Sequence, residues 1–234
     1  MSLYQPETSS QEHQPSPDRT DAILAKQVLG GNTSAFEFLV QRYKTPLFSF
    51  ICRFLGDYDL ACNVSQQVFL RLYTSLPKLD TGEPFRPWLF HVAHNCCVDE
   101  LRRKHRSALH FSQLEGSEGK PDGPSDIPDP RLLPEEVVER RDLRAQLQDA
   151  ILALPPKFRS VVILRYSSQM SFSEIGKVLD MSDATAKASF HQAKGLLRKT
   201  LLARLDATQH NSSRKKPTSL WRSLLFTMRM VFWS

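Results

Sequence analysis

Residues 171–199, SFSEIGKVLDMSDATAKASFHQAKGLLRK, decide the fold, because spacing, turn chemistry and charge agree there. The first part has apolar side chains at helical spacing: Phe172, Ile175, Val178 and Leu179. Ser182 then stands where the N-cap of a second, longer helix belongs. The stretch therefore predicts a helix, a tight turn and a helix.

The second of these helices carries two parallel stripes of side chains. The apolar stripe consists of Ala186, Phe190, Ala193 and Leu197, and the basic stripe, about 100° around the helix, of Lys187, His191, Lys194 and Arg198. Opposite the apolar stripe, Ala184, Ala188 and Gly195 leave room for a groove to approach. The pattern is typical of a helix in the major groove of DNA, with cations on phosphates. A helical hairpin with a solvated basic edge explains it too, so the rest of the chain must decide.

Length and charge limit the classes of protein that fit. The chain has 234 residues and is 41% hydrophobic, which is enough for one large or two small domains, and we expect two small ones. The formal net charge is +6, but residues 211–234 hold five cations and no acid. The basicity is therefore local, which excludes a protein that coats nucleic acid uniformly.

The four cysteines, Cys52, Cys62, Cys96 and Cys97, lie in predicted helices without a paired spacing, which indicates reduced, cytosolic thiols. His91 and His94 lie near the last two and suggest zinc. However, no second ligand pair follows at finger-like spacing, and helical cysteines are commonly buried. We therefore predict no metal and no cofactor. The N-terminal residues show no secretory signal pattern, so we expect a cytoplasmic protein.

Apolar spacing close to 3.6 residues runs through the chain, without extended period-two alternation. We therefore predict an all-α fold of two small helical domains joined by a flexible linker, the second containing a helix-turn-helix. The expected parts are a disordered tail (1–20), a helical domain (21–106), a Pro-rich acidic linker (107–134), the helix-turn-helix domain (135–206) and a basic, apolar tail (207–234). Within the first domain, Pro46 is expected to start a new helix.

A helix expected over residues 85–106 ends in the strongest charge run of the chain, RRKHR at 102–106. Cations at a helix C-terminus interact favourably with the helix dipole, so a solvated end explains this run as well as phosphate contacts do. Nothing in the chain suggests independent catalysis: we find no activated nucleophile, carboxylate pair or phosphate loop. We therefore expect a protein that is not an enzyme.

The last predicted helix, residues 220–233, is apolar except for Arg222, Ser223, Thr227 and Arg229. It is too short and too charged to span a bilayer. Four interpretations stay open: a membrane-surface anchor preceded by the basic residues 214–216, docking on the chain itself, docking on a partner, or a tail without a fixed structure.

Four segments in order resemble the sigma factors of bacterial RNA polymerase, and among them the small extracytoplasmic-function (ECF) group. They are ACNVSQQVFLRLY (61–73), PFRPWLFHVAHN (84–95), LPPKFRSVVILRY (154–166) and SFSEIG (171–176). The resemblance covers about residues 21–206. It implies a non-enzymatic subunit that binds core RNA polymerase and promoter DNA, commonly opposed by an anti-sigma factor.

The resemblance also implies three binding surfaces. The helix over 61–75 would bind polymerase through Asn63, Gln66, Gln67, Leu70 and Arg71. The loop 78–84 and the helix 85–106 would capture the separated −10 strand, with Trp88, His94, Asn95, Arg102, Arg103 and Lys104 as candidates. Trp88 also suits a core position. The second helix of the helix-turn-helix would bind the −35 duplex through Thr185, Lys187, Ala188, His191, Gln192, Lys194 and Arg198.

Five positions depart from the family pattern. Asn63 and Gln67 replace acids, which removes two negative charges from the expected polymerase contact. Ser189 and Gln192 replace frequent arginines, so bidentate guanine recognition is not available from them. Asp180 replaces a common turn glycine, although Asp tolerates a left-handed backbone better than most residues.

Two rival functions remain at this stage. A stand-alone helix-turn-helix regulator would bind duplex DNA without engaging polymerase. A membrane-attached adaptor would depend on the C-terminal tail, so that deletion of residues 211–234 would abolish its function.

Overall fold

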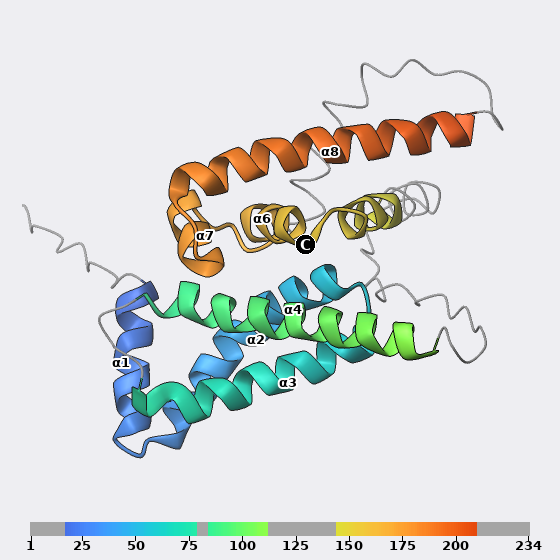
Figure 1. The fold of residues 1–234 in the computed structure, drawn as a ribbon. Coiled ribbons are helices and arrows are strands. Elements are labelled where there is room, and N and C mark those ends of the chain that lie inside the picture. The colour runs from blue at the N-terminus through green and yellow to red at the C-terminus, as the bar shows by residue number, and fades with distance from the viewer. Residues whose placement is uncertain (1–16, 79–83, 112–143, 210–234) are drawn as a thin grey trace, which may run out of the picture.

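The computed structural model describes residues 17–78, 84–111 and 144–209, and every regular element in these ranges is helical (Figure 1). The all-α prediction is therefore confirmed. The elements are α1 (Pro17–Leu29), α2 (Thr33–Leu55), α3 (Tyr58–Ser75), the 3₁₀ turn η1 (Leu76–Lys78), α4 (Phe85–Phe111), a helix over 144–152, α6 (Pro156–Tyr166), α7 (Phe172–Leu179) and α8 (Asp183–Gln209). Most of the expected linker, the start of the N-terminal tail and the C-terminal helix at 220–233 lie outside the described residues.

Helices α2 and α3 are joined by a tight turn that local chemistry specifies. Gly56 ends α2 with a φ of 71°, a left-handed conformation that glycine adopts without steric cost. Asp57 then caps α3, because its side chain accepts a hydrogen bond of 3.1 Å from the Leu60 N–H. The two helices consequently pack antiparallel around a fully buried core: Leu39, Leu47, Phe50, Phe54, Leu72 and Phe90.

The expected helix start at Pro46 is wrong. Helix α2 runs unbroken through this residue, although proline removes one backbone donor from the ladder. Tyr43 before it and Leu47 and Phe50 after it are all buried on one side of the helix. Packing of this continuous apolar stripe outweighs the local cost of the missing hydrogen bond.

A buried carboxylate fastens α1 to α2. Asp21 is fully buried and accepts hydrogen bonds from the Tyr43 hydroxyl and from Nη1 of Arg42. Burial, followed by the neighbouring Asp21, raises the pKa of Tyr43 far above its ordinary value. Helix α1 begins at Pro17, four residues before the expected start, and α4 continues beyond the expected end to Phe111.

The two groups of helices, α1–α4 and 144–209, lie directly against each other. In Figure 1, α8 forms the outer layer, α6, α7 and the 144–152 helix the middle one, and α1–α4 the opposite layer. Helix α7 packs on α4 and α6 packs on α2, while α8 covers α6 and α7. Buried residues of both groups join in one hydrophobic cluster.

Candidate nucleic-acid interface

The turn between α7 and α8 has the geometry of a helix-turn-helix. The Ser171 hydroxyl accepts from the Glu174 N–H (3.2 Å), and the Glu174 carboxylate accepts from the Ser171 N–H (2.7 Å), a complete capping box. Asp180 ends α7 in the left-handed conformation, with φ 51° and ψ 51°, as expected. A Cβ on Gly176 would lie 2.6 Å from the Met181 carbonyl oxygen, so glycine is required where the turn crosses α7.

Helix α8 begins and packs as its sequence predicts. The Ser182 hydroxyl accepts a hydrogen bond of 3.2 Å from the Thr185 N–H, which is the predicted N-cap. The expected apolar stripe is buried, and Phe190 packs at its centre, 5.5 Å from the ring of Tyr166 and 5.6 Å from that of Phe172. Helix α8 therefore leaves its opposite faces to solvent.

All seven residues predicted for duplex binding are exposed on α8: Thr185, Lys187, Ala188, His191, Gln192, Lys194 and Arg198. The Lys194 ammonium lies 5.8 Å from the ring centroid of Phe190, so its stem covers the edge of the core. A Cβ on Gly195 would have no neighbour within 4 Å, so one side of the helix is open to close approach. The exposed surface thus combines cations, hydrogen-bonding groups and small residues, as a helix in a major groove requires.

Ser189 does not belong to this surface. Only 4% of its area is exposed, and it lies beside the apolar stripe. A side chain at this position therefore faces the domain interior, whereas Gln192 is exposed. Of the two positions singled out for lacking arginine, only 192 presents a side chain to a groove.

The predicted strand-binding residues of α4 fall into two groups. Trp88 is half-buried beside Phe85 (ring centroids 6.2 Å apart), and His94 is half-buried against Phe54 (5.9 Å). Burial lowers the pKa of His94, so its imidazole is neutral near neutral pH. Asn95 is exposed and donates a hydrogen bond of 2.9 Å to Nε2 of His91.

The second group is the charge run at 102–104, whose members are exposed but paired with acids. Arg102 lies 3.5 Å from Asp99, and Arg103 lies 2.9 Å from Glu100. Lys104 lies 3.0 Å from the Asp57 carboxylate, whose pKa is lowered chiefly by the Leu60 N–H. Because α4 continues to Phe111, the run does not lie at a helix end, so the expected interaction with the C-terminal helix dipole is wrong. Phosphate binding by the run stays a prediction.

Helix α3 presents the predicted polymerase contact as one exposed face. Asn63, Gln66, Gln67, Leu70 and Arg71 are all exposed, while Val64, Val68 and Leu72 fill the core on the other side. Leu70 keeps 65% of its area exposed within this otherwise polar face. An exposed leucine among polar residues is a candidate anchor for a protein partner.

The histidines and cysteines considered for zinc do not converge. Cys96 and Cys97 are buried, and burial raises the pKa of both thiols. Nδ1 of His91 donates a hydrogen bond of 2.9 Å to the Val178 carbonyl, while Nε2 accepts from Asn95, so both ring nitrogens are already used within the protein. In the ranges described, no three His, Cys, Asp or Glu side chains gather as metal ligands.

Three side chains connect the two groups of helices, a role that the sequence did not predict for any of them. Nη1 of Arg159 donates to the Phe54 carbonyl (2.8 Å), His91 donates to the Val178 carbonyl, and Arg86 donates to the Ser168 carbonyl. Arg86 also lies 3.6 Å from the Glu174 carboxylate. The acceptors are mostly backbone carbonyls, which leave no signature in a sequence.

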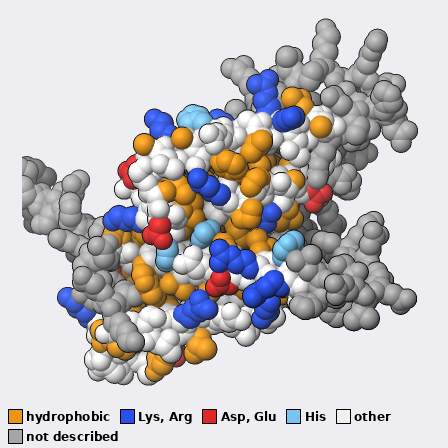
Figure 2. Space-filling view, in the orientation of Figure 1, with side chains coloured by type: hydrophobic (Ala, Val, Ile, Leu, Met, Phe, Trp, Pro, Cys, Tyr) orange, Lys and Arg blue, Asp and Glu red, His pale blue; other side chains and the backbone are white. Residues whose placement is uncertain are grey.

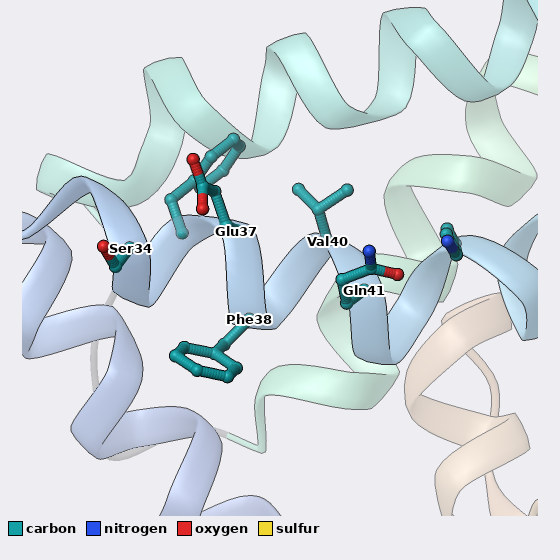
Figure 3. Close-up of a pocket in the computed structure, with 7 residues that line it drawn as sticks. Ser34, Glu37, Phe38, Val40 and Gln41 are labelled. Carbon is teal, nitrogen blue, oxygen red and sulfur yellow. The ribbon is translucent and has the colours of Figure 1, made fainter.

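An open pocket of about 520 Å³ lies on α2 (Figure 3). Its lining comes from that single helix: Ser34, Phe36, Glu37, Phe38, Val40, Gln41 and Lys44. Phe38 is 66% exposed. On the face shown in Figure 2, Lys and Arg side chains occur in separate groups, interspersed with apolar side chains.

Comparison with known proteins assigns each of the two groups of helices to a protein family model. Residues 39–107 match the family model for sigma-70 region 2, and residues 144–197 match that for sigma-70 region 4. ECF RNA polymerase sigma factor SigW of Bacillus subtilis is 32% identical over 176 residues, which cover 75% of this chain and 94% of SigW. The ECF RNA polymerase sigma-E factor of Escherichia coli K12 is 26% identical over 179 residues (75% and 91%).

Solved structures agree with this assignment. CnrH, solved in complex with the cytosolic domain of CnrY, is 25% identical with a TM-score of 0.56, over 80% of this chain and 98% of CnrH. Sigma factor RpoE of Bartonella quintana, solved with the anti-sigma factor NepR, shares the fold with a TM-score of 0.57 at 17% identity, over 71% of this chain and 96% of RpoE. The two family models together define an all-α protein of the sigma-70 class. Within that class, the chain belongs to the ECF sigma factors.

A search of the described helices for one long and apolar enough to cross a membrane finds none.

Proposed function

We propose that this ECF sigma factor recruits core RNA polymerase through α3, captures the opened −10 strand on α4 and binds the −35 duplex with α8. The observation that carries the proposal is the set of seven exposed residues on α8. Six of them lie in the part of the chain that matches region 4, residues 144–197, and Arg198 follows it directly. The α3 and α4 surfaces lie in the part that matches region 2.

Duplex binding by α8 is supported by the positive charge of its exposed surface and by the small residues on that surface. Lys187, Lys194 and Arg198 supply cations for phosphates, while Gln192 supplies an amide that pairs well with adenine. Ala188 and Gly195 allow the helix to lie close to the bases. Because the proposed duplex-binding set contains one arginine, Arg198, we expect a −35 element recognised mainly by amide, hydroxyl and apolar contacts.

Strand capture by α4 is supported by a row of aromatic and amide groups followed by cations. Trp88 and His94 offer rings on which an unstacked base can stack, and Asn95 offers hydrogen bonds to a base edge. Arg102 and Arg103 lie further along the same helix. Both arginines would exchange their acidic partners for phosphates.

Polymerase binding by α3 is supported by the exposed Leu70 within a face of amides. Without the acids usual at positions 63 and 67, this contact would depend more on apolar burial and less on charge. Its affinity should therefore be less sensitive to salt than a contact made through ion pairs.

We further infer a non-catalytic, cytoplasmic role, since the proposed partners, polymerase and promoter DNA, are found in that compartment. Because RpoE of Bartonella quintana was solved with an anti-sigma factor, we expect an anti-sigma factor for this chain as well. Such a partner would compete for the surfaces described above.

The proposal is tested by overproducing the chain in cells, mapping new transcript starts and recovering the chain with an affinity tag. We expect core polymerase subunits to co-purify, and new starts to share two upstream sequence elements. Recovery of DNA without polymerase subunits would instead favour the stand-alone regulator. Sedimentation with anionic liposomes at low salt addresses the adaptor: a full-length chain that stays in the supernatant excludes membrane-surface binding by the tail.

A further inference from the structure

We propose that the C-terminal tail, residues 211–234, binds the chain peripherally to an anionic membrane surface. None of the residues proposed above for polymerase or promoter DNA lies in this segment, so membrane binding goes beyond the proposed function. Two observations carry it. One is the apolar and charge pattern of the tail, and the other is the surface that the described helices offer around the end of α8.

The apolar side chains of residues 220–233 gather on one side of the helix that the sequence predicts there. Seven of them fall within about 140° when each residue turns by about 100°: Leu220, Trp221, Leu224, Leu225, Met228, Val231 and Phe232. Arg222 and Arg229 are seven residues apart and lie together just outside this arc. An apolar arc beside arginines, with a tryptophan near each end, is typical of a helix that lies in the interface between membrane and water.

Basic residues precede this predicted helix. Arg214, Lys215 and Lys216 lie four to six residues before Leu220, and residues 211–234 together hold five cations and no acid. An apolar helix and a polybasic cluster supply the two signals that stable peripheral binding requires. A helix of 14 residues is about 21 Å long, whereas the hydrocarbon core of a bilayer is about 30 Å thick. The tail therefore fits the surface of a bilayer and not its full thickness.

Helix α8 has left the packed core before the tail begins. Leu201 is 5% exposed, whereas Leu202 is half-buried and Ala203 is exposed. In Figure 1, the C-terminal end of α8 lies in the outer layer and extends beyond α6. The tail therefore follows from the edge of the helix-turn-helix domain and not from its core.

The described helices of this domain offer no apolar patch that the tail could cover instead. In the described ranges, six large, exposed apolar side chains lie on α1, α2 and α3: Ile23, Leu29, Phe38, Tyr58, Leu70 and Tyr73. These helices belong to the layer opposite α8 (Figure 1). Between residues 144 and 203, where side chains are described, Leu196 is the one large apolar side chain in this class, with 38% of its area exposed. A single leucine does not match the seven apolar side chains of the tail.

Charge also disfavours packing of the tail back along α8. Lys194, Arg198 and Lys199 are exposed on the second half of α8 and have the same sign as the five cations of the tail. Like charges repel at short range, whereas an anionic bilayer attracts both sets. An anionic lipid surface is therefore complementary to the tail in apolar character and in charge.

Co-sedimentation of the full-length chain with lipid vesicles tests this proposal. Vesicles of phosphatidylcholine with phosphatidylglycerol are compared, at low salt, with vesicles of phosphatidylcholine alone. We expect affinity for the anionic vesicles to be at least tenfold higher, because each cation near the surface strengthens binding about fivefold. Raising the salt concentration to about 0.5 M should weaken this binding, since it screens the charges.

Two substitutions separate insertion of the apolar face from attraction between charges. Met228→Asp places a carboxylate near the centre of the apolar arc, whereas Ser223→Asp adds the same charge about 140° away. We expect Met228→Asp to lower vesicle affinity at least 30-fold, through lost burial and lost attraction, and Ser223→Asp to lower it no more than about fivefold. Both variants should keep wild-type affinity for a −35 duplex of a promoter mapped for this chain, which confirms that they fold.

A wild-type chain that stays in the supernatant at low salt would overturn membrane binding and favour docking of the tail on a protein partner. Equal losses of vesicle affinity in Met228→Asp and Ser223→Asp would also overturn it, because the apolar face would then not enter the bilayer. Absence of transcript with core polymerase would instead contradict the proposed function, whatever the vesicles show.

Discussion

Arg159 in α6 donates a hydrogen bond of 2.8 Å from Nη1 to the carbonyl oxygen of Phe54 in α2, 105 residues earlier in the chain. Its Nη2 donates to the Leu154 carbonyl (3.1 Å) and to that of Leu152. Burial lowers the pKa of this guanidinium, although it stays protonated at any physiological pH. One buried cation thus satisfies the end of α2 and the end of the 144–152 helix together.

Arg159→Met should therefore reduce stability, because it keeps a long apolar stem but leaves three carbonyls without their charged donor. We expect the free energy of unfolding to fall by about 2–3 kcal/mol, measured by urea denaturation followed by circular dichroism. Lys157→Met, an exposed change on the same helix, serves as the control and should stay within about 0.5 kcal/mol. Equal stability of Arg159→Met and wild type would show that the interface contact contributes nothing.

Lys187→Ala with Lys194→Ala should weaken duplex binding through lost phosphate contacts. We expect the slope of log affinity against log salt to become less negative by about 2, about one unit for each lysine. Fluorescence anisotropy with a labelled −35 duplex at several salt concentrations measures it. Lys199→Ala is the matched control, since Lys199 is exposed on the same helix but about 120° away from Lys187. A slope unchanged in the double variant would remove α8 from the duplex interface.

Leu70→Ala should weaken holoenzyme formation, because it deletes the apolar centre of the proposed α3 contact. We expect core polymerase affinity to fall by about 1–2 kcal/mol, roughly 5- to 30-fold. Surface plasmon resonance with immobilised core enzyme gives the comparison. Phe38→Ala removes an equally exposed apolar side chain from α2, outside the proposed contact, and should have no effect. Equal losses from both variants would point to a different docking face.

Gly176→Ala and Gly195→Ala should change stability in opposite directions. The new methyl at 176 would meet the Met181 carbonyl at 2.6 Å, which we expect to cost about 1–3 kcal/mol. The methyl at 195 meets nothing within 4 Å in an exposed helix interior, so we expect a gain of about 0.5–1 kcal/mol. Thermal unfolding measures both. A stable Gly176→Ala protein would contradict the turn geometry between α7 and α8.

Stability should decrease as the solution becomes acidic, partly through His94. Burial lowers the pKa of His94 in the folded chain below its ordinary value of 6.5. As pH falls below that value, the unfolded chain binds a proton that the folded chain resists, so folding loses free energy until the folded pKa is also passed. We expect His94→Phe to lose less stability than wild type between pH 7.5 and 5.5 in urea unfolding. His105→Asn, at an exposed position, should leave the wild-type pH dependence intact, and a pH profile unchanged in His94→Phe would exclude this cause.

The helix-turn-helix was predictable from the sequence because its determinants are local. The Ser182 N-cap and the apolar stripe around Phe190 appear as expected, and the Ser171 capping box lies within the same 29 residues. The prediction of a helix start at Pro46 was wrong because it considered only the local free-energy cost of proline in a helix. The packing that outweighs this cost involves residues before and after Pro46 in α2. Charge and family pattern alone could not predict that Ser189 is buried, since a serine suits either the buried or the exposed side of a helix.

The contact between the two groups of helices could not be predicted for a different reason. Arg159, His91 and Gln148 bind the backbone carbonyls of Phe54, Val178 and Arg53. Every residue carries such a carbonyl, so the partner cannot be inferred from residue type. Only the three-dimensional arrangement reveals that α7 covers the side of α4 that carries His94.

Reconstituted run-off transcription tests the central claim most directly. Core RNA polymerase is combined with a promoter mapped for this chain, with and without the purified full-length protein. We predict a discrete transcript from the mapped start only when the chain is present, and its loss in the Lys187→Ala, Lys194→Ala variant. A chain that binds the promoter yet yields no transcript with core polymerase would contradict the claim that it acts as a sigma factor.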